Sequence, residues 1–339
     1  MKTNKHYRPH RIGINIATRP VAGGSYLTKY NKRCCMGSWE EARALEEELL
    51  RDCEVRKTAC GDGHMVWRIW GNGPPLVMLH GGAGSWRHWA LNIRSLARYF
   101  TLLIADLPGL GDSAEPPIPF DNNNFRSSVR HLANIICDGI DGLIGEKTHF
   151  KILAFSFGAI NSGYIALRMG SRVQHLTLVG AGAMGCPWSG LPAQPKSLRG
   201  TKTEKERREV HRHNLGILMI GNPNNIDDRA VYLQSKNISR ARLRSYRIAG
   251  TDTLRWALEQ VNVPISGIWG RGDVYAMPDL EGRIDVIKGI FNSADCRVIE
   301  GAGHWVMYEA ADTFNQVGLE QLGAITPKSE GEVGQANAC

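Results

Sequence analysis

The feature that most limits the fold of this chain is a repeated alternation of apolar runs with helix-like stretches. The runs lack the polar alternation of half-exposed strands, as is typical of parallel strands buried on both faces. Each run ends in a turn before the next helix-like stretch, and this order predicts a doubly wound α/β sheet. The predicted strands of the repeat are Leu76–Leu79, Thr101–Ala105, Phe150–Ala154, Leu176–Val179, Ile265–Trp269 and Cys296–Ile299.

The residues before this repeat predict a helix and two further strands. Ser38–Cys53 should be helical, because Ser38 can cap it and Glu41 stands three residues on, as in a capping box. Strand-like segments follow near residues 55–60 and 64–70. The expected sheet therefore has eight strands, mostly parallel, with helices on both faces.

One long segment, residues 186–249, interrupts the repeat and contains no strand-like run. Thr203 and Glu206 predict a second capping box, and a charged helix should follow through His213. An apolar cluster over residues 215–220 is too dense to face solvent all round. We interpret the segment as a helical lid over the sheet, inserted between two parts of the core, residues 38–185 and 250–325.

The net charge of +8 belongs to one end of the chain. Residues 1–38 hold eight basic and no acidic residues, and the basic residues that remain equal the 33 acidic ones. The body therefore offers no basic face for nucleic acid. We interpret residues 1–37 as a disordered extension, with an organelle-targeting segment as the alternative, and residues 326–339 as a frayed tail.

Cysteine usage and hydropathy favour a cytoplasmic protein without a membrane anchor. The eight cysteines form no CxxC pair, and a chain of 339 residues can bury a core without disulfides. No apolar run reaches the ~18 residues of a membrane-spanning helix. His211 and His213 stand at alternate helical positions that face apart, so no metal site is expected, and nothing indicates a cofactor. The expected partner is a small-molecule substrate, and a homo-oligomer stays an open alternative.

The pentapeptide AFSFG, residues 154–158, joins a predicted strand to the helix-like run Ala159–Met169. A sharp strand–turn–helix junction strains its middle residue and pushes that side chain out of the sheet. The flanking positions must be small because strand and helix pack closely there, and Ala154 adds one methyl group to the usual glycine. The pattern predicts that Ser156 is a nucleophile, with a serine in an ordinary turn as the alternative.

A Gly-rich turn, HGGAG over residues 80–84, follows the first predicted strand of the repeat. Such a turn can direct backbone N–H groups at a developing oxyanion, and the expected donors are the N–H groups of Gly82 and Phe157. A phosphate-binding loop is the alternative. The absence of a Walker lysine and of GxGxxG spacing disfavours it.

Asp273 and His304 each follow a predicted strand. Because parallel strands present their carboxyl ends to one crevice, both should lie close to Ser156. A serine hydroxyl needs a base to remove its proton, which His304 can do near neutral pH, and Asp273 would fix the tautomer of that base. Taken singly, each could instead be a residue of an ordinary surface loop.

These motifs together resemble the α/β-hydrolases over about residues 74–323, and the order Ser, Asp, His along the chain is the order of that family. Within it, the chain is most similar to the meta-cleavage product hydrolases, which split a carbon–carbon bond in vinylogous 1,5-diketones. The resemblance implies an α/β-hydrolase fold with a lid, and a structural turn at Asp106, Gly109 and Gly111. It rests on HGGAGSWRHW (80–89), DLPGLGDS (106–113), AFSFGA (154–159), WGRGD (269–273) and GHWVMYEAADTFN (303–315).

The chain departs from these relatives at Ala154, where they usually have Gly, and at Phe155, where they often have Asn. A lid arginine in that family binds the substrate carboxylate. A solvated helix face is the competing interpretation of the arginines here. The candidates are Arg199, Arg207, Arg208 and Arg212. The expected pocket includes Trp86, Trp89, Leu218 and Trp305, with core packing as the equal alternative for the tryptophans.

The function favoured by these residues is hydrolysis of an ester or an activated ketone through an acyl-serine, on a medium-sized, partly apolar substrate. Hydrolysis of ring-cleavage dienoates is the alternative that the resemblance implies. A ligand-binding receptor on a hydrolase scaffold, as known for some plant hormone sensors, is an alternative of another class. Epoxide hydrolases and haloalkane dehalogenases share the fold but use an aspartate nucleophile, and Ser156 argues against both.

Overall fold

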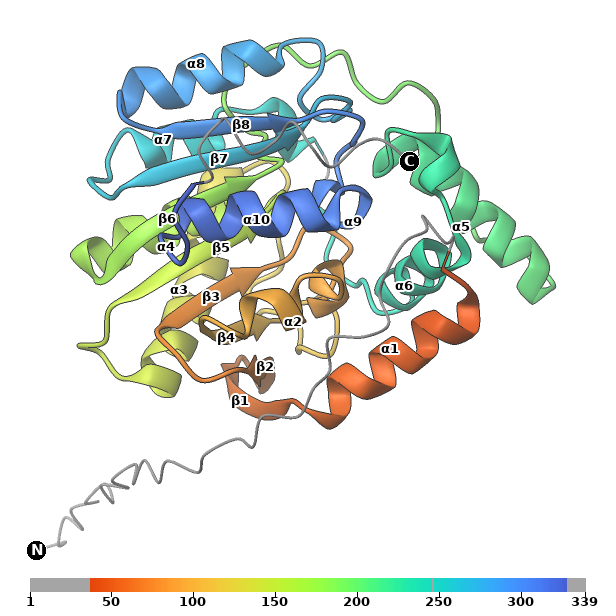
Figure 1. Ribbon diagram of the computed structural model, residues 1–339, viewed down its shortest axis with the longest axis horizontal. Helices are drawn as coiled ribbons and strands as arrows, with labels where there is room; N and C mark the ends of the chain where they lie inside the picture. The colour runs from red at the N-terminus through yellow and green to blue at the C-terminus, as the bar shows by residue number, and fades with distance from the viewer. Residues whose placement is uncertain (1–36, 246, 328–339) are drawn as a thin grey trace, which may run out of the picture. The chain divides into compact units, whose positions relative to one another are not determined.

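The computed structural model describes residues 37–245 and 247–327. At its centre is an eight-stranded sheet in the order β1-β2-β4-β3-β5-β6-β7-β8. β2 is antiparallel to both of its neighbours, and every other pair is parallel (Figure 1), so the predicted fold class is confirmed. The strands are β1 Glu54–Cys60, β2 Gly63–Trp70, β3 Pro75–Leu79, β4 Thr101–Ala105, β5 Phe150–Phe155, β6 Val173–Val179, β7 Ile265–Gly270 and β8 Asp295–Ile299.

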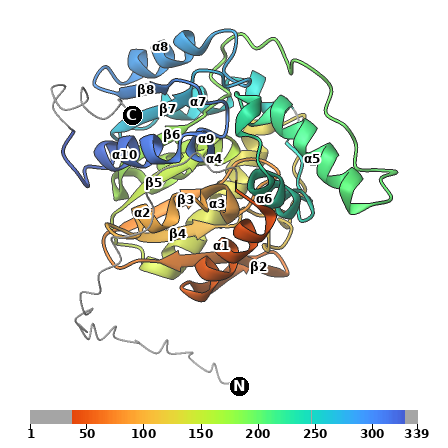
Figure 2. The same ribbon diagram turned by 45° about the vertical axis from the view of Figure 1, so that its right-hand side comes forward.

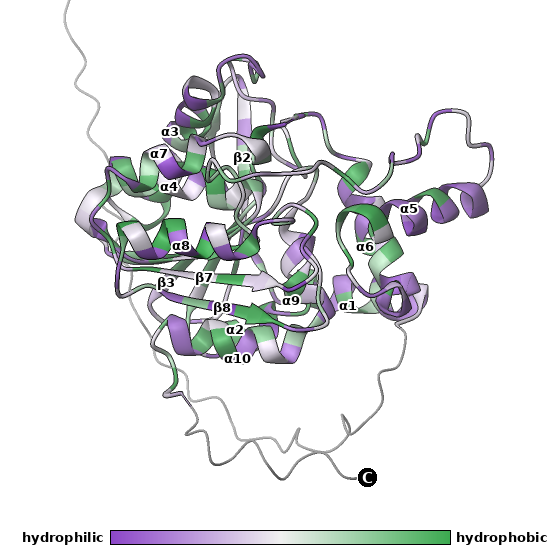
Figure 3. Cartoon of the chain, turned by 90° about the horizontal axis from the view of Figure 1, so that it is seen from above, coloured by the Kyte–Doolittle hydropathy of each residue, from purple (hydrophilic) through white to green (hydrophobic). Residues whose placement is uncertain are grey.

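Helices cover both faces of this sheet. The side chains of β3 show how its apolar run serves both, since Val77 and Leu79 enter one hydrophobic cluster and Leu76 and Met78 the other. Alternate side chains of a strand point to opposite faces, so an unbroken apolar run supplies two layers of core. One face carries α3 Phe125–Ile144, α4 Phe157–Met169, α7 Thr253–Leu258 and α8 Leu280–Ile290, and the other carries α2 Ile93–Leu96, α9 Val306–Glu309 and α10 Ala311–Gln321 (Figure 3).

A third group of helices lies beyond the carboxyl ends of the parallel strands (Figures 1 and 2). It consists of α1 Trp39–Arg51, α5 Glu204–Leu218 and α6 Asp228–Ile238, and α6 packs against both of the others. A buried carboxylate joins this group to the core, because Glu46 of α1 pairs with Arg87 and accepts a hydrogen bond from Tyr232 of α6.

The long segment over residues 186–249 contributes α5, α6 and two short 3-10 turns, Pro223–Asn225 and the start of Ile248–Gly250. Among its described residues no named strand occurs. α5 continues to Leu218, past the expected end at His213, because Leu215 and Ile217 are buried and extend the packed face of the helix.

Capping boxes begin α1 and α5, as the sequence predicts. In α1, Ser38 Oγ accepts from the N–H of Glu41 at 3.1 Å, and the Glu41 carboxylate accepts from the N–H of Ser38 at 2.8 Å. Thr203 and Glu206 form the same reciprocal pair in α5. These contacts satisfy N–H groups that a helix cannot pair internally.

Replacing Ser38 with alanine should lower the free energy of unfolding by about 1 kcal/mol, because one N–H at the start of α1 loses its acceptor. Ser38→Thr keeps the hydroxyl and is the matched control. Urea unfolding of the three proteins measures the difference. Equal stability of the alanine variant and wild type would show that this cap contributes nothing.

The described cysteines are Cys53, Cys60, Cys137, Cys186 and Cys296, and each is a free thiol. Across residues 37–245 and 247–327, no helix has the length and apolar character needed to cross a bilayer. Of the predicted end segments, residues 1–36 and 328–339 lie outside the described residues.

Candidate active site

Ser156 occupies the junction between β5 and α4 with a backbone φ of +53° and ψ of −112°. A positive φ is strained for any residue with a side chain and persists only where surrounding packing enforces it. That packing is tight, since a Cβ on Gly158 would lie 2.6 Å from the carbonyl oxygen of Leu79. Ala154 is fully buried without disturbing β5, so its extra methyl group is accommodated. The predicted strained turn is present, and α4 begins two residues earlier than expected, at Phe157.

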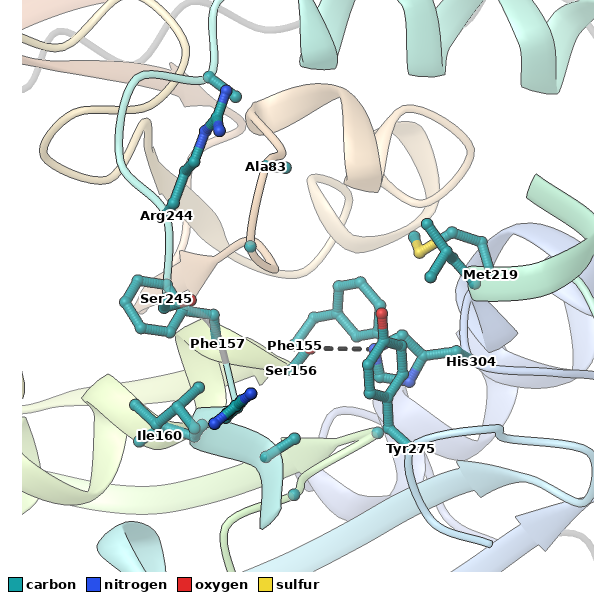
Figure 4. Close-up of a pocket in the computed structure, with 18 of the residues that line it drawn as sticks. Ala83, Phe155, Ser156, Phe157, Ile160, Met219, Arg244, Ser245, Tyr275 and His304 are labelled. Carbon is teal, nitrogen blue, oxygen red and sulfur yellow. Dashed lines mark hydrogen bonds between the residues drawn. The ribbon is translucent and has the colours of Figure 1, made fainter. Parts of the chain in front are cut away.

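Ser156, His304 and Asp273 form one hydrogen-bonded series, of which Figure 4 draws the bond between Ser156 and His304. His304 Nε2 lies 2.9 Å from Ser156 Oγ, and His304 Nδ1 lies 2.8 and 2.9 Å from the two carboxylate oxygens of Asp273. His304 and Asp273 are buried and Ser156 is half-buried. The carboxylate places the ring proton on Nδ1, which leaves Nε2 free to accept the proton of the serine hydroxyl.

Two aromatic rings and a glycine hold His304 in place. Its ring centroid lies 4.4 Å from that of Tyr275 and 4.8 Å from that of Phe155. Gly180 has a φ of +53°, and a Cβ there would lie 3.1 Å from the His304 ring and 3.2 Å from Asp273 Oδ2. The N–H of Tyr275 donates to Asp273 Oδ1 at 2.9 Å. The imidazole and its carboxylate therefore have little freedom to turn.

Tyr275 is a residue of this site that the sequence interpretation missed. It lines the cavity over Ser156, and Figure 4 shows its ring lying over the ring of His304. Burial, with a smaller effect of the Asp273 carboxylate, raises the pKa of Tyr275 to about 12, so its phenol stays protonated at neutral pH. Its position two residues after Asp273 indicates that it lies near the site. The direction of its ring depends on tertiary packing, which the sequence pattern does not specify.

Gly82 and Phe157, the predicted oxyanion donors, lie side by side. A Cβ on Gly82 would be 3.7 Å from Phe157 Cβ. Phe157 is the first residue of α4, so its N–H has no acceptor within the helix. Within the described residues neither N–H donates a hydrogen bond. Both are thus available to an oxygen atom bound next to Ser156.

A cavity of about 410 Å³ lies over Ser156 and His304 (Figure 4). Its walls are mainly apolar, and both the sheet and the 186–249 segment contribute to them. Phe155, Phe157 and Ile160 come from the core, Leu218 and Met219 from the end of α5, and Gln234 and Ile238 from α6.

The structure places three of the four predicted pocket residues elsewhere. Leu218 lines the cavity, but Trp86, Trp89 and Trp305 are fully buried in the core, and their assignment to the pocket was wrong. Trp305 donates its indole N–H to the carbonyl oxygen of His88 at 3.0 Å, and the Arg87 guanidinium lies over the Trp86 ring. Large rings beside the Gly-rich turn fill the space between sheet and helices, so core packing is their role.

The predicted carboxylate-binding arginines also lie away from the cavity. Arg207 and Arg208 pair with Glu204 on the exposed face of α5, and Arg212 pairs with Asp228. Arg199, the fourth candidate, is exposed and does not line the cavity either. Two other arginines, Arg244 and Arg247, do line it, from the loop after α6. The sequence does not single out Arg244 and Arg247, because the carboxylate-binding arginine was expected in the charged stretch that forms α5 and not in the loop after α6.

Comparison with known proteins extends these observations. The chain matches the model of the alpha/beta hydrolase family over residues 76–317. It is 28% identical over 305 residues to a 2-hydroxy-6-oxononadienedioate/2-hydroxy-6-oxononatrienedioate hydrolase of Pseudomonas putida, covering 83% of this chain and 95% of that protein. It is 26% identical over 220 residues to the pimeloyl-[acyl-carrier protein] methyl ester esterase of Vibrio campbellii, covering 62% of this chain and 80% of that one.

Among solved structures, the esterase RhEst1 from Rhodococcus sp. superimposes with a TM-score of 0.63 at 20% identity, over 80% of this chain and 98% of that one. This likeness shows the shared fold. The family match begins at the second residue of β3 and includes the Ser156 turn, Asp273 and His304. Because the family model matches residues 76–317 and the eight-stranded sheet has the architecture of that family, the chain belongs to the alpha/beta hydrolase family and is an α/β-fold hydrolase.

Proposed function

We propose that the protein is a serine hydrolase that cleaves an ester or an activated ketone through an acyl-serine. The observation that carries this proposal is the Ser156–His304–Asp273 series at the floor of the cavity. His304 Nε2 accepts the proton of Ser156 as Oγ attacks the substrate carbonyl, and Asp273 stabilises the imidazolium that forms. The N–H groups of Gly82 and Phe157 stabilise the oxyanion, typically by ~3–4 kcal/mol per donor.

The second half of the reaction uses the same groups. His304 donates its new proton to the leaving group, and the carbonyl–leaving group bond breaks to give the acyl-serine. Water then enters and loses a proton to His304 as it attacks the acyl carbon. Ser156 leaves with that proton, and a carboxylic acid is released.

The cavity supports a medium-sized, partly apolar substrate. A volume of about 410 Å³ is within the range of small-molecule sites, and its walls are mainly apolar. The 186–249 segment would act as the lid, because its apolar side chains Leu218, Met219 and Ile238 line the cavity over Ser156, where they would help to exclude water.

Carbon–carbon cleavage of a ring-cleavage dienoate is the second candidate. Arg244 and Arg247 favour it, because either guanidinium could bind the substrate carboxylate at the wall of the cavity. A relative named as a 2-hydroxy-6-oxononadienedioate hydrolase also supports it. His304 and the oxyanion donors would then promote ketonisation before Ser156-dependent cleavage.

A comparison of kcat/KM for p-nitrophenyl butyrate and for a 2-hydroxy-6-oxo-dienoate decides between these reactions. We expect the ester to be the better substrate, because Phe155 puts an apolar ring against His304 where carbon–carbon hydrolases often have asparagine. Arg247→Met should lower kcat/KM for the anionic dienoate and change that for the neutral ester by less than about twofold, since a neutral substrate gains nothing from charge.

A dienoate advantage of a hundredfold or more, ~2.7 kcal/mol of transition-state preference, would decide for carbon–carbon cleavage. No turnover of either substrate would contradict both reactions and favour a ligand-binding receptor on this scaffold.

A further inference from the structure

Gly81, the residue before the predicted oxyanion donor, is held between two buried imidazoles. His80 Nδ1 lies 2.8 Å from the Gly81 carbonyl oxygen, and His80 Nε2 accepts from the N–H of Leu107 at 2.9 Å. On the other side, the N–H of Gly81 donates to His88 Nδ1 at 3.2 Å. His80 is fully buried and His88 is 2% exposed. Neither ring belongs to the Ser156–His304–Asp273 series.

These contacts fix the tautomer of both rings. A backbone N–H can only donate, so the nitrogen that faces it must carry a lone pair. His80 therefore bears its proton on Nδ1 and donates it to the Gly81 carbonyl oxygen, and His88 bears its proton on Nε2. Burial lowers the pKa of His80, and it lowers that of His88 well below the usual range, so both rings stay neutral.

The Gly81 carbonyl and the Gly82 N–H belong to one planar peptide unit and point in opposite directions. Holding the oxygen therefore orients the N–H. A hydrogen bond accepted by the carbonyl also polarises the unit, which makes its N–H a stronger donor. Gly82 lines the cavity beside Phe157, on the side where an oxyanion would form.

The packing of the turn leaves little room for another arrangement. A Cβ on Gly81 would lie 2.8 Å from the Phe155 ring, and a Cβ on Gly84 would lie 2.2 Å from His88 Cε1. The glycines of this turn thus let the backbone approach both the nucleophile strand and the His88 ring.

We propose that His80 and His88 form a clamp on Gly81 that orients the Gly82 N–H toward the oxyanion. This histidine clamp rests on the proposed acyl-serine chemistry, and both rings act as positioning residues through the peptide unit. Their contribution should appear when the oxyanion forms and be absent when a neutral ligand binds, because only the charged oxygen needs the aligned donor.

Two substitutions at His80 separate the clamp from simple packing. The amide of asparagine lies near the position of imidazole Nδ1, and that of glutamine near Nε2. His80→Asn can therefore still donate to Gly81, whereas His80→Gln can accept from Leu107 but loses the bond to Gly81. For p-nitrophenyl butyrate, His80→Gln should lower kcat by about tenfold to a hundredfold relative to wild type, with KM within about threefold. This loss is smaller than the ~10²–10³ loss in kcat expected when an oxyanion donor is deleted outright, because the Gly82 N–H is still present but less well oriented. His80→Asn should recover most of that loss.

Inhibition supplies a second readout. An aryl trifluoromethyl ketone forms a covalent adduct with Ser156 and places its oxyanion next to the N–H groups of Gly82 and Phe157, while the matching methyl ketone binds as a neutral carbonyl. His80→Gln should weaken the trifluoromethyl ketone by the same factor as kcat/KM and leave the affinity of the methyl ketone unchanged. His175→Gln is the control, because it removes a half-buried imidazole that bonds Ser266 between β6 and β7 and should lower only the melting temperature.

If the His80 variants do not fold, His88→Asn and His88→Leu give the same test from the other side, since only asparagine keeps an acceptor for the Gly81 N–H. If wild type hydrolyses the ester, equal activity of His80→Gln and His80→Asn, or of His88→Leu and His88→Asn, would overturn the clamp and leave the proposed function standing. A wild type that neither turns over the ester nor binds the trifluoromethyl ketone would overturn the proposed function and the clamp with it.

Discussion

Replacing Ser156 with alanine should lower kcat for p-nitrophenyl butyrate by about 10⁴-fold or more, because the acyl-enzyme can no longer form. His304→Ala should cost a similar factor. Asp273→Asn should cost about 10⁴-fold, because the amide favours the wrong tautomer of His304. The triple variant should be little worse than Ser156→Ala alone, since the three residues act as one unit. Steady-state kinetics on purified variants measure each factor.

Ser162→Ala provides the matched control for this series. Ser162 is a buried serine of α4 that donates to the carbonyl oxygen of Ala159 at 2.7 Å, outside the cavity. Its replacement should leave kcat unchanged, and the melting temperature of Ser156→Ala should stay close to that of wild type. Wild-type turnover by Ser156→Ala would contradict the assignment of the nucleophile.

Of the substitutions considered, Asp106→Ala should cause the largest fall in the free energy of unfolding, with little change in kcat. The carboxylate is fully buried and accepts from Arg68 at 2.9 Å, from the N–H of Trp86 at 2.8 Å and from the N–H of Asp112 at 3.0 Å. Its removal leaves a buried guanidinium with one partner fewer and two N–H groups unpaired, a cost of about 3–5 kcal/mol. At roughly 2–4 °C per kcal/mol for a large domain, the melting temperature should fall by about 10 °C.

Calorimetry of Asp106→Ala measures that fall, and kcat below the transition should stay within about threefold of wild type, because the Asp106 carboxylate contacts neither the Ser156–His304–Asp273 series nor the Gly81 peptide unit. The double variant Arg68→Met, Asp106→Leu should recover part of the stability, since it removes the uncompensated charge. A large loss of kcat at unchanged melting temperature would contradict the structural role of this turn.

The parts of the fold predicted from the sequence are those that local signals determine. The unbroken run of β3 had to supply both faces of the sheet, and Ser38 with Glu41 had to begin a helix. The proximity of Ser156, Asp273 and His304 was also predictable, because each follows a strand and parallel strands end at one edge of the sheet.

The parts that could not be predicted depend on the direction of side chains in loops and in tight packing. No local pattern explains why Trp305 enters the core while Tyr275 lies against His304, since both stand close in sequence to a residue of the series. Arg247 reaches the cavity from a loop where its φ is +63°, a conformation that no pattern of residues specifies. Contacts of this kind are set by tertiary packing. Because a loop can adopt many conformations on the surface of the same fold, its sequence alone does not predict which side chains enter the cavity.

Covalent labelling tests the central claim most directly. A fluorophosphonate probe reacts with a serine whose hydroxyl is activated by a neighbouring base, so intact-mass and peptide mass spectrometry identify the nucleophile. We predict one adduct per chain, on the peptide that contains Ser156, absent from Ser156→Ala and strongly slowed in His304→Ala. An adduct on a different serine, or a fully active protein that takes up no probe, would contradict the account.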